Sequence, residues 1–443
     1  MRRALVIVLL AALWACGSAL AAGGRLAADP MQAQEWWLSR VGADGADSAA
    51  PPGPGVPITI VDSGVDPTHP EFTGRPSTSF LNDQTVLGQE EWHGTAVASV
   101  AAAPANGVGL VGVYPEAALQ LWDASPAGRI STVRAAEGVE VAAQHCPGVI
   151  NLSFGSVEQD PQLDAAVLDA VHKGCLIVAA AGNNADNGNP TIYPAALPHV
   201  LAVAATDEND HVASFSSGGP WLDLAAPGTD VPVAVPFAFD PTGYKITAGT
   251  SFSAPIVAAA AAWVWTVRPT LTAEQLIAIL RSTARDVPPS GFDNATGYGI
   301  VDIPGALAAP VPTADPDEPN DDVEQVRPGA LFRDGEPALT TRARPARRIA
   351  GTLDAKDPRD LYRIWVPANR VVHATVAAGG DAAPRIWGPG TVSVHETARA
   401  RRRDLKGPLV RGTKKGFAAY VEVLLTGRSS SASYTLKVTV STR

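Results

Sequence analysis

Three segments that lie far apart in the chain contain an acid, a base and a hydroxyl. Asp62 ends an apolar run in the sequence Ile-Val-Asp-Ser-Gly, and His93 begins an Ala-rich run in the sequence His-Gly-Thr. Ser251 lies in Gly-Thr-Ser-Phe-Ser-Ala-Pro, at the start of a long hydrophobic run. A serine hydroxyl becomes a strong nucleophile when an adjacent base takes its proton, and a carboxylate can orient that base. These residue types therefore predict nucleophilic catalysis through a catalytic triad.

Each of the three segments also has a simpler interpretation. Asp-Ser-Gly is common in plain turns, a histidine at a helix start can be a cap or a surface group, and Ser251 could be a helix N-cap. Their order along the chain excludes an α/β-hydrolase esterase, in which the serine comes first and lies in a Gly-x-Ser-x-Gly motif. A non-catalytic binding protein descended from an enzyme would normally have lost one of these groups. We therefore favour an enzyme.

The residues around these segments alternate between strand-like and helix-like runs. Short runs rich in β-branched residues predict buried strands at Val56–Val61, Val149–Phe154, Leu176–Ala181 and Val200–Ala204. Ala-rich runs predict helices at Gly94–Ala103, Val133–Ala143, Leu163–His172 and Ala254–Val267. This alternation predicts an α/β domain, built as a parallel sheet with helices on both faces. Functional groups then gather where the strands end, as Asp62 does.

The three motifs resemble those of the subtilisin-like (subtilase) serine peptidases, in which the acid, the histidine and the serine follow one another in this order. Ala179–Asn183 is similar to the strand end that carries the family's oxyanion-hole asparagine, and Asn151–Gly155 is similar to the strand that binds substrate backbone. The resemblance spans roughly residues 29–308. It implies the subtilisin-like fold and a serine endopeptidase that cleaves protein and peptide substrates through an acyl-enzyme.

The resemblance also implies a role for each site residue. Asp62, His93 and Ser251 would form the triad, and the Asn183 side chain would stabilise the oxyanion together with the Ser251 backbone N–H. The first specificity pocket would be shaped by Ser153, Phe154, Gly155, Ala180 and Gly182. Because these pocket residues include no acid, we expect broad specificity with a preference for apolar or aromatic side chains.

A structural calcium ion is implied at the loop 103–110, which follows the helix after His93. Pro and Gly residues break the helix there and expose backbone carbonyls, which suit a hard cation. The ligands would come from Gln32, Glu71, Pro104, Asn106, Val108 and Leu110, with Gln34 as the alternative to Gln32. Glu71 stands where the family usually has an aspartate and reaches one methylene further. The alternative is a loop held by its own hydrogen bonds, without calcium.

A segment rich in Pro and acidic residues, from Pro310 to Pro319, predicts the end of this domain. Beyond it, short strand-like runs predict a small C-terminal β-sandwich, with strands at Leu361–Val366, Val371–Ala377, Ala418–Leu425 and Tyr434–Val440. Three segments resemble the bacterial pre-peptidase C-terminal domain, a module often appended to secreted proteases: Asp315–Asp321, Asp357–Tyr362 and Tyr434–Val438. We expect the peptidase domain at 22–308, a linker at 309–325 and the sandwich at 326–443.

The N-terminal residues predict export. Arg2 and Arg3 precede an apolar run, and Ala19-Leu20-Ala21 fits a signal-peptidase site, so we expect a signal peptide at residues 1–21 and a secreted protein. In the alternative interpretation, a lipoprotein box ends at Cys16, which anchors the protein to a membrane. The two other cysteines, Cys146 and Cys175, are either a disulfide at one edge of the sheet or two buried free thiols.

Composition and charge restrict the partners. The chain is 46% hydrophobic and 18% charged, which predicts a folded globule. Its net charge is −10, yet residues 341–443 hold 20 of the 34 Lys and Arg residues. A basic cluster there is either a solvated loop or a site for an anionic cell-wall polymer, and consists of Arg399, Arg401, Arg402, Arg403, Lys414 and Lys415. We expect a monomer. We also expect that the protein binds no nucleic acid, because no aromatic platforms flank this charge.

Overall fold

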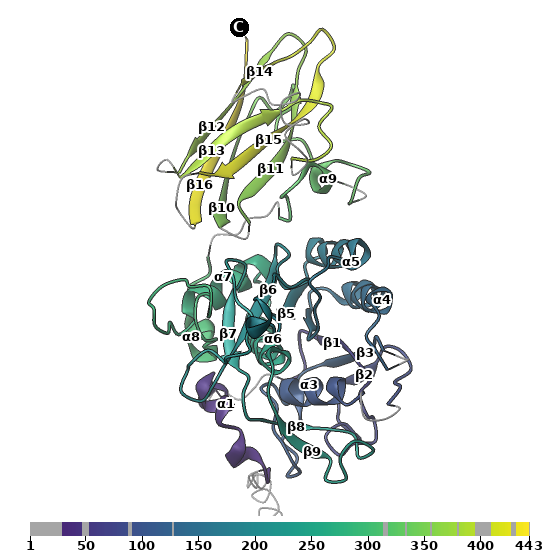
Figure 1. Cartoon of the computed structure of the whole chain (residues 1–443). Coiled ribbons are helices and arrows are strands. Elements are labelled where there is room, and N and C mark those ends of the chain that lie inside the picture. The colour runs from purple at the N-terminus through teal and green to yellow at the C-terminus, as the bar shows by residue number, and fades with distance from the viewer. Residues whose placement is uncertain are drawn as a thin grey trace, which may run out of the picture.

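The computed structural model describes residues 29–46, 53–86, 91–125, 128–312, 318–332, 335–354, 357–378, 381–394, 409–426 and 431–442. The expected signal peptide with Cys16, the segment Asp315–Asp317 and the four arginines of the basic cluster therefore lie outside the described residues. An α/β unit is followed by an antiparallel β-sandwich (Figure 1).

A parallel sheet with the strand order β2-β3-β1-β4-β5-β6-β7 forms the centre of the α/β unit. Its strands are β1 (Ile58–Asp62), β2 (Thr78–Phe80), β3 (Leu119–Asp123), β4 (Val149–Leu152), β5 (Leu176–Ala180), β6 (Val200–Thr206) and β7 (Leu224–Pro227). The four strands that the sequence predicts are confirmed, with small shifts at their ends. β2 was missed because it is short and largely exposed, and β3 because Gln120 interrupts its apolar run.

Helices cover both faces of this sheet. α3 (His93–Ala102) packs with α6 (Thr250–Val267), and α4 (Thr132–Ala142) packs with α5 (Pro161–His172). By length and composition α6 could cross a membrane, but 83% of its apolar window is buried inside the α/β unit, as in a core helix. α6 also starts earlier than the sequence predicts. Gly249 takes the N-cap position, so the interpretation of Ser251 as an N-cap is wrong.

Shorter elements surround this core. They are η1 (Gln32–Gln34), α1 (Trp36–Arg40), α2 (Ala43–Ala46), η2 (Ala143–His145), η3 (Ala185–Asn187), α7 (Ala273–Thr283) and α8 (Ile303–Ala308), with the hairpin β8 (Val231–Ala234) and β9 (Tyr244–Thr247). η1 and α1 bring the N-terminal segment against the loop after α3, through a hydrogen bond from Met31 N to Gly109 O at 2.8 Å.

The order of the strands determines where functional groups meet. β1 lies between β3 and β4, so the chain leaves β1 toward one side of the sheet and later returns on the other side. In α/β sheets such a switch point opens a crevice at the carboxyl ends of the strands. Asp62 ends β1, Ser153 follows β4 and Asn183 follows β5, so all three lie at this edge.

Cys146 and Cys175 form a disulfide, which settles the choice left open by the sequence. They precede β4 and β5, which pair in parallel from Val149 and Leu176 onward. The expectation that both thiols lie at one sheet edge is therefore confirmed. The bond links the two strands at the edge opposite Asp62.

The C-terminal unit is a sandwich of two antiparallel sheets, with strand orders β10-β16-β12-β14 and β11-β15-β13. Its elements are α9 (Val323–Val326), β10 (Ala346–Asp354), β11 (Arg359–Val366), β12 (Val371–Ala377), β13 (Ala382–Trp387), β14 (Leu409–Arg411), β15 (Phe417–Leu425) and β16 (Ser431–Ser441). The four predicted strands are confirmed, and β10, β13 and β14 are additional. Asn320 is fully buried and its Oδ1 accepts a hydrogen bond from Leu361 N, so part of the expected linker packs with the sandwich.

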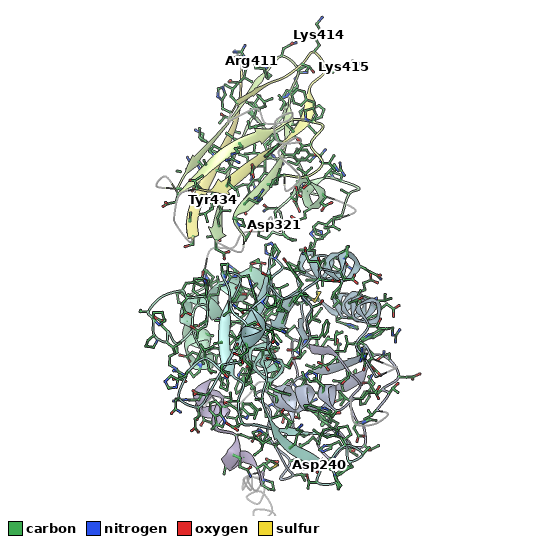
Figure 2. The ribbon with its side chains drawn as sticks, viewed as in Figure 1. Asp240, Asp321, Arg411, Lys414, Lys415 and Tyr434 are labelled. Atoms are coloured by element: carbon green, nitrogen blue, oxygen red, sulfur yellow. A yellow bond between two sulfur atoms is a disulfide. The ribbon has the colours of Figure 1, made fainter. Side chains whose placement is uncertain are left out.

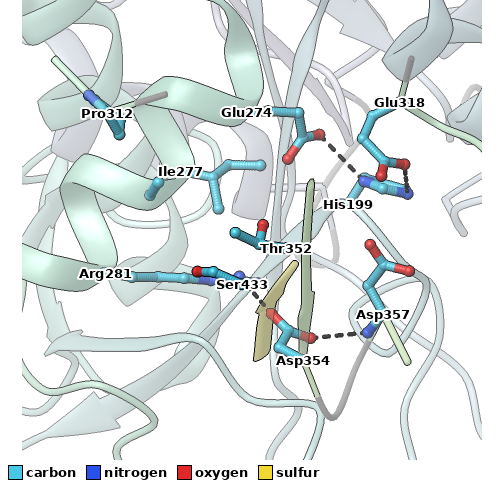
Figure 3. Close-up of a pocket in the computed structure, with 11 residues that line it drawn as sticks. His199, Glu274, Ile277, Arg281, Pro312, Glu318, Thr352, Asp354, Asp357 and Ser433 are labelled. Carbon is cyan, nitrogen blue, oxygen red and sulfur yellow. Dashed lines mark hydrogen bonds and ion pairs between the residues drawn. The ribbon is translucent and has the colours of Figure 1, made fainter. Parts of the chain in front are cut away.

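Charged contacts cross the junction between the two units (Figure 3). Arg281 of α7 donates a hydrogen bond to Asp354 of β10 at 2.7 Å. His199 lies between Glu274, at 3.1 Å, and Asp321, at 3.2 Å. Burial opposes protonation of this imidazole, but the two carboxylates raise the pKa of His199 well above its usual value. The sandwich is thus docked by ion pairs around a cavity of about 300 Å³.

Candidate active site

Asp62 and His93 form a hydrogen-bonded pair at the switch point of the sheet. Asp62 Oδ1 accepts hydrogen bonds from the Ser63 backbone N–H and from His93 Nδ1, both at 2.7 Å. The Asp62 side chain is fully buried, whereas 25% of the His93 side chain is exposed, so the imidazole can be reached from outside. Burial opposes protonation of His93, but the charge and hydrogen bond of Asp62 outweigh it and raise the pKa of His93 above 6.5.

The motif residues beside this pair hold β1 and α3 together. A Cβ on Gly94 would lie 1.8 Å from the Ser63 carbonyl oxygen, so only glycine allows this approach. Gly94 N donates to Ser63 Oγ at 2.7 Å, and Asp66 N donates to Thr95 Oγ1 at 3.0 Å. The two motifs therefore form one structural unit that positions His93 against Asp62.

Ser251 lies in the first turn of α6 and exchanges two hydrogen bonds with Ser153. Ser251 Oγ donates to the Ser153 carbonyl at 3.0 Å, and Ser153 Oγ donates to the Ser251 carbonyl at 2.8 Å. The second bond replaces a helical one, because Pro255 has no N–H to donate to the Ser251 carbonyl four residues earlier. The His93 ring lies 5.7 Å from the ring of Phe252, the residue after Ser251. The Ser251 hydroxyl thus points to the Ser153 carbonyl, and a nucleophilic role would require it to turn toward His93.

Asn183 is fixed beside the start of α6. Its Oδ1 accepts hydrogen bonds from Thr250 N and Thr250 Oγ1, both at 3.0 Å. Its Nδ2 would lie 3.3 Å from a Cβ on Gly249, so the amide donor faces the residues just before Ser251. Together with the positive end of the helix dipole at the start of α6, this donor favours negative charge at the site.

Comparisons with known proteins agree with this geometry. A sequence profile of the Subtilase family matches residues 53–299, which is more than half of the chain. Subtilisin Savinase from Lederbergia lenta is 36% identical over 278 residues, covering 62% of this chain and 99% of that protein. Subtilisin E from Bacillus subtilis (strain 168) is 34% identical over 281 residues, covering 62% and 71%. The chain belongs to the subtilase family.

It is accordingly a serine-type endopeptidase that acts on proteins and peptides. The solved structure of the psychrophilic subtilisin-like protease Apa1 from the Antarctic psychrotroph Pseudoalteromonas sp. AS-11 matches with a TM-score of 0.54 at 20% identity. This match covers 62% of the subtilase and 97% of Apa1, and it shows a shared subtilisin-like fold.

The residues expected at the first specificity pocket come together after β4 and β5. Ser153, Phe154 and Gly155 follow β4, while Ala180 ends β5 and Gly182 lies just beyond it. No sequence pattern pointed to Ile192, a buried residue against which both glycines pack. A Cβ would approach the Ile192 side chain to 2.5 Å from Gly155 and to 2.8 Å from Gly182.

An aromatic cluster beside His93 was also missed. Trp92 stacks on Phe239 and on Phe252, with ring centroids 5.3 and 6.3 Å away. The Lys245 ammonium lies 4.1 Å from the centre of the Trp92 ring. In the sequence, Trp92 beside His93 is the one hint of this cluster. Phe239 and Lys245 come from the β8–β9 hairpin region, which is distant in the sequence.

The loop expected to bind calcium is held by carboxylates. Asp29 Oδ1 accepts hydrogen bonds from the backbone N–H groups of residues 106, 107 and 108, at 3.2, 2.8 and 2.9 Å. Glu71 Oε1 accepts from Leu110 N and from the Tyr244 hydroxyl, both at 2.9 Å. Glu35 accepts from the Val111 N–H at 3.1 Å. Backbone N–H groups of the loop thus point at the side chains of Asp29, Glu71 and Glu35.

Two of the expected calcium ligands, Glu71 and Leu110, lie close together. Their contact is a hydrogen bond from the Leu110 N–H to the Glu71 carboxyl group. Asn106 Oδ1 accepts a hydrogen bond from Val108 N, Pro104 is only partly buried, and Gln32 lies on η1. Burial raises the pKa of Glu71 to about 7 and that of Glu35 to about 8. Below these pKa values the two carboxyls hold protons that the unfolded chain releases at lower pH, so their contribution to stability falls as pH rises through this range.

Metal-ligating side chains also gather at the junction of the two units. His199, Asp321 and Asp357 form one group, and Glu318, Asp357 and Asp360 form another. The ligating atoms within each group all lie within 4.8 Å of one another, a spacing that can hold a cation. The pKa of Asp357 is raised well above its usual value by burial and by the charges of Asp321, Glu318 and Asp360.

We predict that the His93 imidazole titrates above 6.5 and that Asp62→Asn moves this titration below 6.5. Without the carboxylate charge, only burial remains to act on the ring, and burial disfavours the imidazolium. NMR titration of the His93 ring measures both values. Asp66→Asn is the matched control, because Asp66 shares the same loop without contacting His93. Equal titrations of wild type and Asp62→Asn would contradict the pairing.

Proposed function

We propose that Ser251 is the nucleophile of the endopeptidase, with His93 as its general base and Asp62 as the residue that orients the imidazole. The Asp62–His93 hydrogen bond at the switch point, beside the start of α6, carries this assignment. His93 Nε2 would take the Ser251 proton as Oγ attacks the scissile carbonyl, and would then give that proton to the leaving amine. Water would hydrolyse the resulting acyl-enzyme by the same route in reverse.

The oxyanion would be stabilised by the Asn183 side chain and the Ser251 backbone N–H. Support comes from the two hydrogen bonds to Thr250, which fix the Asn183 amide before the substrate arrives. A donor that is already oriented stabilises developing charge without reorganisation. The role is therefore specific to the transition state, and its loss should appear in kcat.

Substrate backbone would bind along Ser153–Gly155, with the side chain before the scissile bond in the pocket formed with Ala180 and Gly182. We propose broad specificity with an apolar preference there. Ile192 behind the two glycines and the buried Ala180 support it, since they present only hydrocarbon. Apolar side chains bind such a surface through the area they remove from water.

Ser251→Ala should reduce casein hydrolysis to near background, because the variant has no nucleophile.

Asn183→Ala should lower kcat by about 10²–10³-fold with little change in KM, the magnitude of losing one oxyanion donor. Steady-state kinetics on a peptide substrate measure both changes. Asn187→Ala, on an exposed part of the same segment, should behave like wild type. Full activity of Ser251→Ala would contradict the assignment.

We propose that the protein is exported and that residues 1–21 are its signal peptide, with lipid anchoring through Cys16 as the alternative. The disulfide between Cys146 and Cys175 supports export, because such bonds persist in oxidising compartments. We also propose a monomer, with the peptidase domain at 22–308.

The C-terminal unit is proposed to be a pre-peptidase C-terminal-like domain. Residues that carry the resemblance meet inside the sandwich, where the Tyr434 hydroxyl hydrogen-bonds both Asp360 and Tyr362. Lys414 and Lys415 lie with Arg411 at the end farthest from the peptidase unit (Figure 2). That position supports binding of an anionic wall polymer away from the active site.

We propose that the loop after α3 is held by Asp29, Glu35 and Glu71 rather than by calcium. The amide hydrogen bonds described above support this alternative. The melting temperature should be equal in millimolar calcium and in EDTA. Asp29→Ala should destabilise the protein by about 1–3 kcal/mol in both buffers, because it removes the carboxyl group that accepts three backbone hydrogen bonds. The exposed Asp186→Ala is the control.

Thermal unfolding followed by circular dichroism measures these effects. A ligand that binds only the folded state must raise the melting temperature by mass action. A calcium-dependent rise in melting temperature that is seen in wild type and absent in Glu71→Ala would show that Glu71 binds calcium. It would contradict the proposal that carboxyl groups hold the loop without calcium.

A further inference from the structure

The His93 ring contacts two aromatic rings as well as Asp62. The Trp92 ring meets it edge-on, with centroids 5.8 Å apart and an interplanar angle of 69°, and the Phe252 ring lies tilted with its centroid 5.7 Å away. Asp62 holds the same imidazole through Nδ1 at 2.7 Å. Because the ring torsion of histidine has no sharp minimum of its own, contacts with neighbouring rings help to decide where Nε2 points.

Trp92 is itself packed against rings from two other segments. It stacks on Phe239, with centroids 5.3 Å apart and an interplanar angle of 26°, and on Phe252, at 6.3 Å and 22°. Stacked rings at such separations attract one another beyond the effect of their buried area. Phe252 is only 2% exposed, so one of the two partners belongs to the core. The indole is therefore held beside the His93 ring.

A cation lies over the same pair of rings. The Lys245 ammonium is 4.1 Å from the centre of the Trp92 ring and 5.0 Å from the centre of the Phe239 ring. An ammonium within about 6 Å of an aromatic face is attracted by it, and tryptophan is the strongest such partner. Lys245 belongs to β9, the strand that leads to Gly249 at the N-cap of α6. The cluster is thus anchored to the strand before Ser251.

The chain positions of the two stacked rings connect the base with the nucleophile. Trp92 directly precedes His93, and Phe252 directly follows Ser251. The stack between Trp92 and Phe252 therefore adds a contact between the start of α3 and the first turn of α6. A general base must lie within hydrogen-bond reach of the hydroxyl from which it takes a proton. This contact lies beside both groups and can fix their relative position.

We propose that Trp92 is a positioning residue, which holds the His93 imidazole in line for the Ser251 hydroxyl, and that Lys245 holds Trp92 in place. The inference rests on the proposed function, in which His93 is the base and Ser251 the nucleophile. Trp92 acts here through the His93 ring, so its effect does not depend on which peptide is bound. A misplacement of about 1 Å at such a site can cost about 10²-fold in rate.

The test separates positioning of the base from binding of a peptide. A small alkyl fluorophosphonate reacts with an activated serine hydroxyl and has no peptide chain to bind. Trp92→Leu, which keeps bulk without an aromatic ring, should lower the rate of Ser251 labelling and kcat on a peptide substrate by the same factor, about tenfold, with KM within about twofold of wild type. Trp92→Phe keeps an aromatic ring beside His93 and should recover most of both rates.

Lys245→Met removes the ammonium and keeps an apolar stem. It should lower the labelling rate and kcat by about two- to fivefold, the size of one cation–π contact. In a Trp92→Leu background it should have little further effect, because the contact is already lost. Ile246→Ala is the matched control and should behave like wild type. Ile246 follows Lys245 on β9, is 56% exposed, and directs its side chain to the opposite face of the strand.

The possible failures are distinguishable. Equal labelling rates in wild type and Trp92→Leu, with or without a raised KM, would overturn the positioning role while the endopeptidase assignment stands. A loss that Trp92→Phe does not recover would overturn it too. If Trp92→Leu does not fold, equal rates in Lys245→Met and wild type would overturn it. Absence of Ser251 labelling in wild type would instead overturn the proposed nucleophile, and the positioning role with it.

Discussion

The proposed catalytic site depends on accommodating the buried side chain of Asp62 inside the protein. A buried carboxylate is costly unless hydrogen bonds or an opposite charge compensate for its lost hydration. Here one oxygen accepts two hydrogen bonds at 2.7 Å, one from its own loop and one from His93. The imidazole can supply that compensation only if α3 begins directly beside the end of β1. The close approach of Gly94 to Ser63 meets this requirement, so the two motifs are parts of one constraint.

A second set of contacts places α6 relative to the same sheet edge. Ser153 ties the first turn of α6 to the end of β4, and Asn183 ties it to the end of β5 through Thr250. Pro255 makes the first tie possible, because it leaves the Ser251 carbonyl without a helical donor. Groups carried by rigid strands and helices hold their geometry more accurately than groups on free loops. The site is therefore positioned by the core, and each motif residue contributes a contact between two elements.

Sequence patterns predicted the parts of the structure that rest on local chemistry. Continuous apolar runs identified β1, β4, β5 and β6, because strands buried on both faces have no polar alternation. The Cys146–Cys175 disulfide stayed open, since sequence spacing does not reveal whether two thiols face each other. The pocket lined by Ile130, Asp164 and Tyr193 could not be predicted, because these residues meet only through tertiary packing. The hydrogen bonds from the loop after α3 to Asp29 and Glu71 could not be predicted, because these acids are distant from the loop in the sequence and reach it only through tertiary packing.

The central claim is that Asp62 and His93 activate the Ser251 hydroxyl. Its most direct test is the reaction of the intact protein with a fluorophosphonate, followed by peptide mapping of the adduct by mass spectrometry. The account predicts one adduct per molecule, on Ser251, and a labelling rate that falls steeply in His93→Ala although Ser251 is still present. Labelling at another residue, or an unchanged rate in His93→Ala, would contradict it.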